Sequence, residues 1–395
     1  MHNFKGSSLL LAVFVGISML SLIISCKSEV KSKANELPQT VVEGYAAIVF
    51  ATYDDALLTA KNLESAVSEF LASPTNENLS SAKTAWITAR KYYGQTEVFR
   101  FYDGPIDNGE TGVEGLLNAW PLDEVYVDYV DGAPNAGIIN NITTYPEITK
   151  SLLVAMNEKG GEENISCGYH AIEFMLWGQD LSNTTAGTRP VADFITGNLI
   201  NDRRRTYLEL TASLLVEHLQ QLKDQWNPEI ENNYYKTFVG LAPEIAIQKI
   251  LTGMGVLSKV ELAGERMFTA YDNANQEDEQ SCFSDNTKAD LMNNIGGIMN
   301  VFFGMYVRYD KSNLQVNAIA DLLLLKDVTL YKQTESLIRT CNNEFQNIYQ
   351  PFDNAIVLAE KRPQVMQAIL SIQQLGDQMA LIAAALGTSI NVNAN

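Results

Sequence analysis

The sequence predicts an all-α protein made of two helical-bundle domains. Apolar residues recur at three- and four-residue steps over most of the chain, which is the spacing of amphipathic helices. Alternating apolar and polar segments joined by Asn-Gly turns, which indicate strands, are scarce. The length of 395 residues suits two domains, and a hydrophobic share of 46% is enough to build packed cores.

Five helical regions are expected in the first half of the chain. They are residues 41–72, 78–101, several short pieces within 113–158, then 165–178 and 190–225. Ser73-Pro74-Thr75 separates the first two regions, because proline interrupts a helix. The segment 102–112, "YDGPIDNGETG", is rich in Pro, Gly and Asp, and its length predicts a functional loop.

The second half repeats this organisation after "WNPE", residues 226–229, which we interpret as the domain boundary. The expected helices are near 243–272, 285–309, 313–360 with a break, and 363–387. The predicted domains are therefore 39–227 and 228–395.

The N-terminus has the pattern of a bacterial lipoprotein signal. Lys5 precedes an apolar run from Leu9 to Ile24, and "IISC" at 23–26 matches a lipobox in which Cys26 becomes the lipidated first residue. We expect a signal peptide at 1–25, a polar tether at 26–38, and a chain anchored in the bacterial cell envelope, at the outer membrane. The alternative is an uncleaved membrane anchor, since the run approaches the length of a bilayer span.

Composition narrows the choice of partners. The formal net charge of −19 argues against nucleic acid, whose phosphates require a basic surface.

With Cys26 lipidated, three cysteines remain: Cys167, Cys282 and Cys341. Cysteines in an oxidising envelope form disulfides in pairs. Because three is an odd number, at least one thiol is unpaired, and the pairing stays open.

The segment "GYHAIEFMLWGQD", residues 168–180, places His170 and Glu173 three apart in an apolar helix. Residues at i and i+3 lie on one helix face, so the two side chains can share a metal ion or form a buried polar pair. Cys167 continues the same stripe. His218, in "LLVEHLQQL", is expected to be an ordinary interfacial residue.

Four further stretches carry charged or polar side chains. "EVFRFYDGPID" contains Glu97, Arg100 and Asp107, and "ELAGERM" contains Glu265 and Arg266, with Gly264 expected to allow close approach. The other two are "NAWPLDEVYVDY", residues 118–129, and "DEQSCFSDNT", residues 278–287. The last one holds Asp278, Ser284 and Asp285, and Asp285 is expected to cap the following helix.

Together, Gly168-x-His170-x-x-Glu173, "FRFYDGPID", "NAWPLDE", "ELAGERM" and "CFSDNT" resemble the imelysin family. The resemblance covers nearly the whole chain after the signal. It implies two all-helical halves, with duplication as one origin, and a site between them. It also implies a bacterial envelope protein linked to iron uptake, in a family classed with metallopeptidases. Gln280 and Lys288 stand where histidines are common in the family, and Lys288 would bring a positive charge near any cation.

Three functions remain open. We favour binding of a divalent metal (iron, zinc or calcium) or a small metal-containing ligand for iron uptake, with an iron-transport or peroxidase partner. The alternatives are a metallopeptidase in which Glu173 is catalytic, and polar residues that serve only the fold. The candidate metal ligands are His170 and Glu173, followed by Glu97, Asp107, Glu265 and Asp278. The candidate ligand-binding residues are Arg100, Arg266, Ser284 and Asp285.

Overall fold

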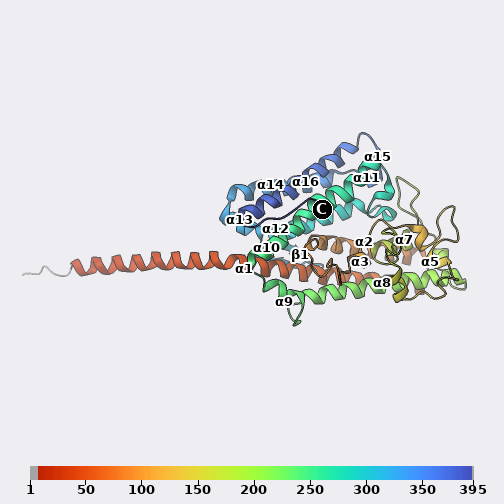
Figure 1. Cartoon of the computed structure of the whole chain (residues 1–395), viewed down its shortest axis with the longest axis horizontal. Coiled ribbons are helices and arrows are strands. Elements are labelled where there is room, and N and C mark those ends of the chain that lie inside the picture. Colours follow the sequence, from red (N-terminus) through yellow and green to blue (C-terminus); the bar gives the residue numbers. More distant parts are fainter. Residues whose placement is uncertain (1–7, 394–395) are drawn as a thin grey trace, which may run out of the picture.

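The computed structural model describes the backbone of residues 8–393 and the side chains of residues 36–393. Helices make up most of it, and the only strands in the described part are the short pair β1 and β2 (Figure 1). The predicted all-α class is confirmed.

The first half is organised around α1 (Ser8–Ala72), which packs against α2 (Asn76–Tyr93) and α8 (Leu199–Trp226). Its buried side chains, such as Val42, Tyr45 and Val49, recur at helical spacing, so one face of α1 enters the core. The break after Ala72 ends at Thr75, whose hydroxyl accepts a hydrogen bond from the backbone N–H of Asn78 at 3.2 Å and caps α2.

Short elements follow α2 and cover one end of the molecule, where α3, α5 and α7 lie close to α8 (Figure 1). They are η1 (Gly94–Phe99), α3 (Glu114–Leu117), α4 (Glu124–Val127), α5 (Gly137–Asn140), α6 (Lys150–Met156), α7 (Tyr169–Trp177) and η2 (Val191–Phe194). Between η1 and α3 the chain forms the loop expected at 102–112.

Apart from α9, which lies beside α8, the second half stacks its helices on the other side of α1 (Figure 1). Its helical elements are α9 (Tyr234–Val239), α10 (Pro243–Val256), η3 (Leu257–Phe268), α11 (Thr269–Asn273), η4 (Gln276–Asp278), η5 (Cys282–Ser284), α12 (Thr287–Phe303), α13 (Ile319–Lys326), α14 (Val328–Asn347), α15 (Phe352–Val357) and α16 (Arg362–Ala385). α16 packs on η3, α10 and α14, and α12 packs on η1. η3 is a π-helix, a rare form that is frequent at functional sites.

A β-hairpin replaces part of the helix expected to reach residue 309. β1 (Met305–Val307) pairs antiparallel with β2 (Asn313–Gln315), in a register that places Tyr306 opposite Leu314. α12 ends because Gly304 adopts a left-handed conformation at φ +67°, and the chain then turns back on itself.

The apolar core runs through both halves. One cluster of buried side chains includes residues from α1, α2, α7 and α8 together with residues from α10, α12 and α16. α8 ends at Trp226, where the boundary was expected, but the division into domains 39–227 and 228–395 stays a prediction.

Among the described residues, no helix is both long and apolar enough to cross a membrane. The signal at 1–25 and the lipidation site Cys26 lie outside the residues whose side chains are described. Lipidation, the tether at 26–38 and the envelope location therefore remain predictions.

Candidate functional site

The turn that begins α7 requires a glycine. Gly168 has φ +90°, a conformation that L side chains rarely adopt, and a Cβ there would lie 2.6 Å from the carbonyl oxygen of Leu117. Only glycine lets the chain pass this close to α3 and then enter the helix. The glycine of the Gly-x-His-x-x-Glu motif therefore fixes the position of the helix that carries His170.

His170 and Glu173 form a fully buried pair on α7. The Nδ1 atom of His170 lies 2.8 Å from Oε2 of Glu173, and both side chains are 0% exposed. The other oxygen, Oε1, accepts hydrogen bonds from the backbone N–H of Ser284 at 3.0 Å and from its hydroxyl at 2.6 Å. This contact joins α7 in the first half to η5 in the second.

Burial favours the neutral form of both partners. It raises the pKa of Glu173 well above its ordinary value and lowers the pKa of His170, with Arg90 as the next cause for His170. The Nε2 atom of His170 has no hydrogen-bond partner. When Glu173 is ionised it accepts from Nδ1–H and leaves Nε2 unprotonated, which is the arrangement by which proteins orient a metal-binding histidine. His170 fits a metal ligand, and Glu173 fits the group that orients it.

A network of guanidinium and carboxyl groups crosses between the halves next to this pair. Glu97 in η1 forms ion pairs with Arg266 in η3 and with Arg100, the latter at 2.9 Å. Glu261 accepts from Arg266 at 2.7 Å. Burial alone would raise the pKa of Glu97, but Arg266 and Arg100 outweigh burial and lower it to about 2. Glu97 is therefore an ionised partner of two arginines.

A second buried ion pair joins α2 to α12. Arg90 and Asp290 lie 3.2 Å apart and are almost completely buried. Arg90 also donates to Asn118 Oδ1 at 2.5 Å, and the Ser281 hydroxyl donates to Asp290 at 2.5 Å. The two ionic contacts, Arg90 with Asp290 and Glu97 with Arg266, pin the halves together.

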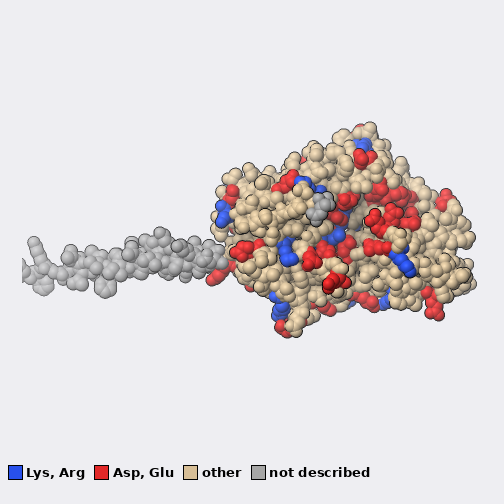
Figure 2. Space-filling view, viewed as in Figure 1, with Lys and Arg blue, Asp and Glu red and all other residues tan. Residues whose placement is uncertain are grey.

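A polar pocket with a volume of about 300 Å³ opens beside this network. Its lining includes six carboxylates and two arginines, and each half of the chain contributes three of the acids. The acids are Glu114, Glu158, Glu162, Glu261, Glu265 and Asp278, and the arginines are Arg100 and Arg266. Negative side chains are therefore in excess, and both arginines are already engaged in ion pairs. The space-filling view shows acidic side chains gathered on this face of the molecule (Figure 2).

Three lining residues carry polar atoms without a partner. They are Nε of Arg100, Nε1 of Trp120 and Oε1 of Gln280. The ring of Trp120 also lies against the imidazole, with 5.0 Å between the ring centroids, so the pocket is close to His170. Unsatisfied donors and acceptors in a pocket are suited to a ligand that completes their hydrogen bonds.

Six of the ten candidate residues do not line this pocket. Glu97, His170, Glu173 and Ser284 lie in the buried contacts described above, whereas Asp107 and Asp285 have other roles. Asp107 accepts hydrogen bonds from the backbone N–H groups of Phe101 and Gly104, so it shapes the 102–112 loop. Asp285 does not cap the next helix as expected, because the N-cap of α12 is Asn286 and Asp285 adopts a left-handed conformation before it. Asp285 instead faces a different acidic cluster.

The structure answers two further expectations, on Gly264 and on Lys288, and shows the role of Asp128. A Cβ on Gly264 would meet nothing closer than 4.0 Å, so this glycine is not required for close approach. The ammonium of Lys288 donates to the carbonyl oxygens of Gln346 at 2.9 Å and Ile348 at 2.6 Å, so its charge is used at the end of α14. The side chain of Asp128 pairs with Arg189 and Arg204 inside the first half and serves the fold.

The three cysteines whose side chains the structure describes are unpaired. Cys167, Cys282 and Cys341 are buried and free, and burial raises the thiol pKa of all three, to about 12 for Cys167 and Cys341. Thiols in this state are poor nucleophiles and poor metal ligands.

Sequence reasoning missed Arg90, Glu114 and Asp290 as parts of the site. Arg90 had a detectable signal, because it follows Trp86 by four residues and precedes Tyr93 by three, on the apolar stripe of its helix. A charged residue on such a stripe needs a buried partner. Glu114 and Asp290 had no comparable signal, since their partners lie far away in the sequence.

An all-α fold whose two halves enclose a buried charged site defines the class of protein. The family model of imelysin, Peptidase M75, matches residues 49–379, and the chain belongs to the imelysin family.

Relatives agree with this assignment. The chain is similar to "Iron-regulated protein A" of Synechococcus elongatus, at 24% identity over 350 residues, which covers 86% of this chain and 84% of that protein. Two crystal structures share the fold. One, described as an iron-regulated protein A precursor from Parabacteroides distasonis, has a TM-score of 0.69 and 20% identity, covering 89% of this chain and 95% of that one. An imelysin-like protein from Psychrobacter arcticum has a TM-score of 0.57 and 12% identity, covering 91% and 98%.

Proposed function

We propose that the chain binds a metal ion, or a small metal-containing ligand, in the acidic pocket, and that it serves iron uptake or homeostasis in the cell envelope. The observation that carries the proposal is the lining of the pocket: six carboxylates against two arginines that are already paired. Oxygen ligands of this kind suit hard cations.

The free nitrogen of His170 supports the same function. Glu173 holds the imidazole in place, Nε2 has no hydrogen-bond partner, and the pocket residue Trp120 lies against the ring. The iron connection comes from the name of the relative in Synechococcus elongatus, which shares 24% identity along most of both chains.

The geometry favours binding over peptide hydrolysis. A catalytic glutamate must reach water or substrate in order to transfer a proton. Glu173 is 0% exposed, and its two oxygens are occupied by His170 and Ser284. The buried ion pairs account for the structural role of Arg90 and Glu97, but they do not explain the excess of acids that line the pocket.

Calorimetry on protein stripped with a chelator tests the proposal, with Fe²⁺ under anaerobic conditions and Zn²⁺ as probes. The variant Glu265→Gln/Asp278→Asn removes two pocket carboxylates that form no ion pair in the described structure. We expect its affinity to fall at least about tenfold, which corresponds to about 1.4 kcal/mol.

The matched control is Glu69→Gln/Glu110→Gln, which removes the same charge from two exposed acids that do not line the pocket. The control should bind like the wild type. Equal affinities for all three proteins, or no binding by the wild type, would contradict the proposal.

A further inference from the structure

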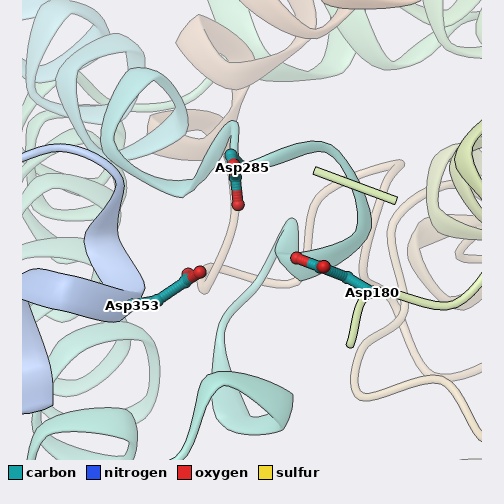
Figure 3. A group of neighbouring side chains, drawn as sticks. All are labelled: Asp180, Asp285 and Asp353. Carbon is teal, nitrogen blue, oxygen red and sulfur yellow. The ribbon is translucent and has the colours of Figure 1, made fainter. Parts of the chain in front are cut away.

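Three aspartates from distant parts of the chain converge outside the acidic pocket (Figure 3). Asp180 follows α7, Asp285 lies between η5 and α12, and Asp353 is in the first turn of α15. Each offers a carboxylate oxygen, and the three atoms lie within 4.8 Å of one another. None of these residues lines the acidic pocket, so the cluster is a separate feature.

The cluster lacks the partners that other buried acids have. Oδ2 of Asp180, Oδ1 of Asp285 and both oxygens of Asp353 are buried and accept no hydrogen bond. Asp353 is 1% exposed and Asp180 is 4% exposed. By contrast, Asp128 and Asp290 are equally buried and each is paired with an arginine. Buried charges without partners are strongly unfavourable unless a counter-charge is bound.

Glu279 is a fourth buried carboxyl beside the triad. It is 0% exposed, and neither of its oxygens has a hydrogen-bond partner of normal geometry. Burial raises the pKa of Glu279 most, and the neighbouring carboxyl of Asp353 raises it next, while the Thr287 hydroxyl lowers it. Glu279 therefore adds an acid next to Asp353 and supplies no counter-charge.

We propose that Asp180, Asp285 and Asp353 bind one hard divalent cation of the size of calcium, with Glu279 behind them as a further negative charge. This site is independent of the acidic pocket and of the function proposed for it.

Ligand type favours calcium over other divalent ions. The triad offers only oxygen, which hard cations prefer, and it lacks the imidazole or thiolate usual for zinc. The three oxygens lie within 4.8 Å of one another, so one ion can contact all of them. Magnesium demands a near-ideal octahedron, whereas calcium accepts the irregular geometry that three separate loops provide.

A cation here would join three loops around the site. Asp285 directly follows Ser284, which holds Glu173, and the carbonyl oxygen of Asp180 accepts a hydrogen bond from Gln276 at 3.0 Å. Binding would therefore clamp the loop after α7 to η5 and α15, and stabilise the junction between the halves.

The test compares the wild type with Asp285→Asn/Asp353→Asn, both stripped with EDTA and titrated with CaCl₂ and MgCl₂ in a calorimeter. We expect weaker binding of magnesium than of calcium, and the loss in the variant of one calcium ion per chain that the wild type binds. The matched control is Glu69→Gln/Glu110→Gln, which removes the same charge from two exposed acids and leaves both the triad and the acidic pocket intact. It should bind calcium like the wild type.

Thermal melting separates binding from folding. In EDTA the double variant should melt at the same temperature as the wild type or higher, because it lacks the repulsion among the carboxylates. Calcium should then raise the melting temperature of the wild type and of the control more than that of the double variant. Equal calcium affinity and equal calcium-induced shifts in the double variant and the wild type would overturn the proposal, as would no calcium effect on the wild type. A loss of calcium binding in Glu265→Gln/Asp278→Asn but not in Asp285→Asn/Asp353→Asn would assign the ion to the acidic pocket and also overturn the proposal.

Discussion

At the scale of single residues, the Gly-x-His-x-x-Glu motif positions α7 and orients the imidazole of His170. Gly168 allows the chain to pass the Leu117 carbonyl, and one helical turn later Glu173 fixes the imidazole of His170. Ser284 then holds Glu173 from the other half of the chain. The motif therefore holds a buried imidazole in a fixed orientation, with Nε2 left without a hydrogen-bond partner.

Substitutions of Glu173 should show which protonation state the fold prefers. Burial raises its pKa, so the neutral amide in Glu173→Gln should be tolerated within about 1 kcal/mol. Glu173→Ala leaves His170 and Ser284 without their partner and should lower the free energy of unfolding by about 2–4 kcal/mol. Urea unfolding of both variants measures the difference, and equal losses would refute the prediction.

Acid stability should depend on Glu97. Its pKa is about 2 in the fold against an ordinary value of 4.5, so the unfolded chain takes up the proton first as the pH falls. The ionised group therefore stabilises the fold fully above pH 4.5, by on the order of 3 kcal/mol, and this contribution is lost as the pH falls from 4.5 toward 2.

Urea unfolding between pH 6 and pH 3 measures this effect. The variant Glu97→Gln/Arg266→Met removes the carboxyl together with one cationic partner, and its stability should decline less steeply over that window. An identical decline in both proteins would mean that other acids control it.

At the scale of elements, the π-helix η3 determines the shape of the acidic pocket. Over its twelve residues it presents Glu261, Glu265 and Arg266 to the pocket and packs its other side on α16. A π-helix turns less per residue than an α-helix, so the side chains that face the pocket differ from those that α-helical spacing would select.

Gly264 in η3, which faces open space, and Gly376 in α16, which packs on η3, should respond in opposite ways to alanine. Gly264 has open space around a Cβ and an ordinary φ, so Gly264→Ala should raise the free energy of unfolding by about 0.5–1 kcal/mol. In Gly376→Ala the new Cβ would lie 2.5 Å from Cβ of Lys259 in η3, and stability should fall by about 1–3 kcal/mol. Urea unfolding checks both values, and a stabilising Gly376→Ala would contradict this description of the contact.

Most helices were predictable because their apolar periodicity is local information. The break between α1 and α2 was predictable from Pro74, and the end of α8 was predictable from "WNPE". The hairpin at 305–315 was not predictable from the apolar pattern. Its strands are only three residues long, too short for an alternating pattern to stand out. The π-helix was also unpredictable, because its apolar spacing looks like that of an α-helix.

At the scale of the whole molecule, long-range charge works against the fold while buried ion pairs support it. The formal net charge is −19, so repulsion among exposed acids acts across the surface. Raising NaCl from about 10 mM to about 150 mM shortens the screening length from about 30 Å to about 8 Å and should raise the melting temperature. The gain should shrink when the pH approaches the isoelectric point, and a melting temperature that falls with salt at pH 7 would contradict the prediction.

The amino-acid sequence by itself determined the all-α class, the family and the position of His170 beside Glu173, because periodicity and motif spacing depend only on neighbours in the chain. Only the tertiary structure decided what those groups meet. Glu97 pairs with Arg266 across 169 positions, and Glu173 bonds Ser284 across 111. It also decided that Asp107 shapes a loop while Asp180, Asp285 and Asp353 converge. The reason is that an acid's role depends on whether a counter-charge lies within a few ångströms, and helix packing sets that distance.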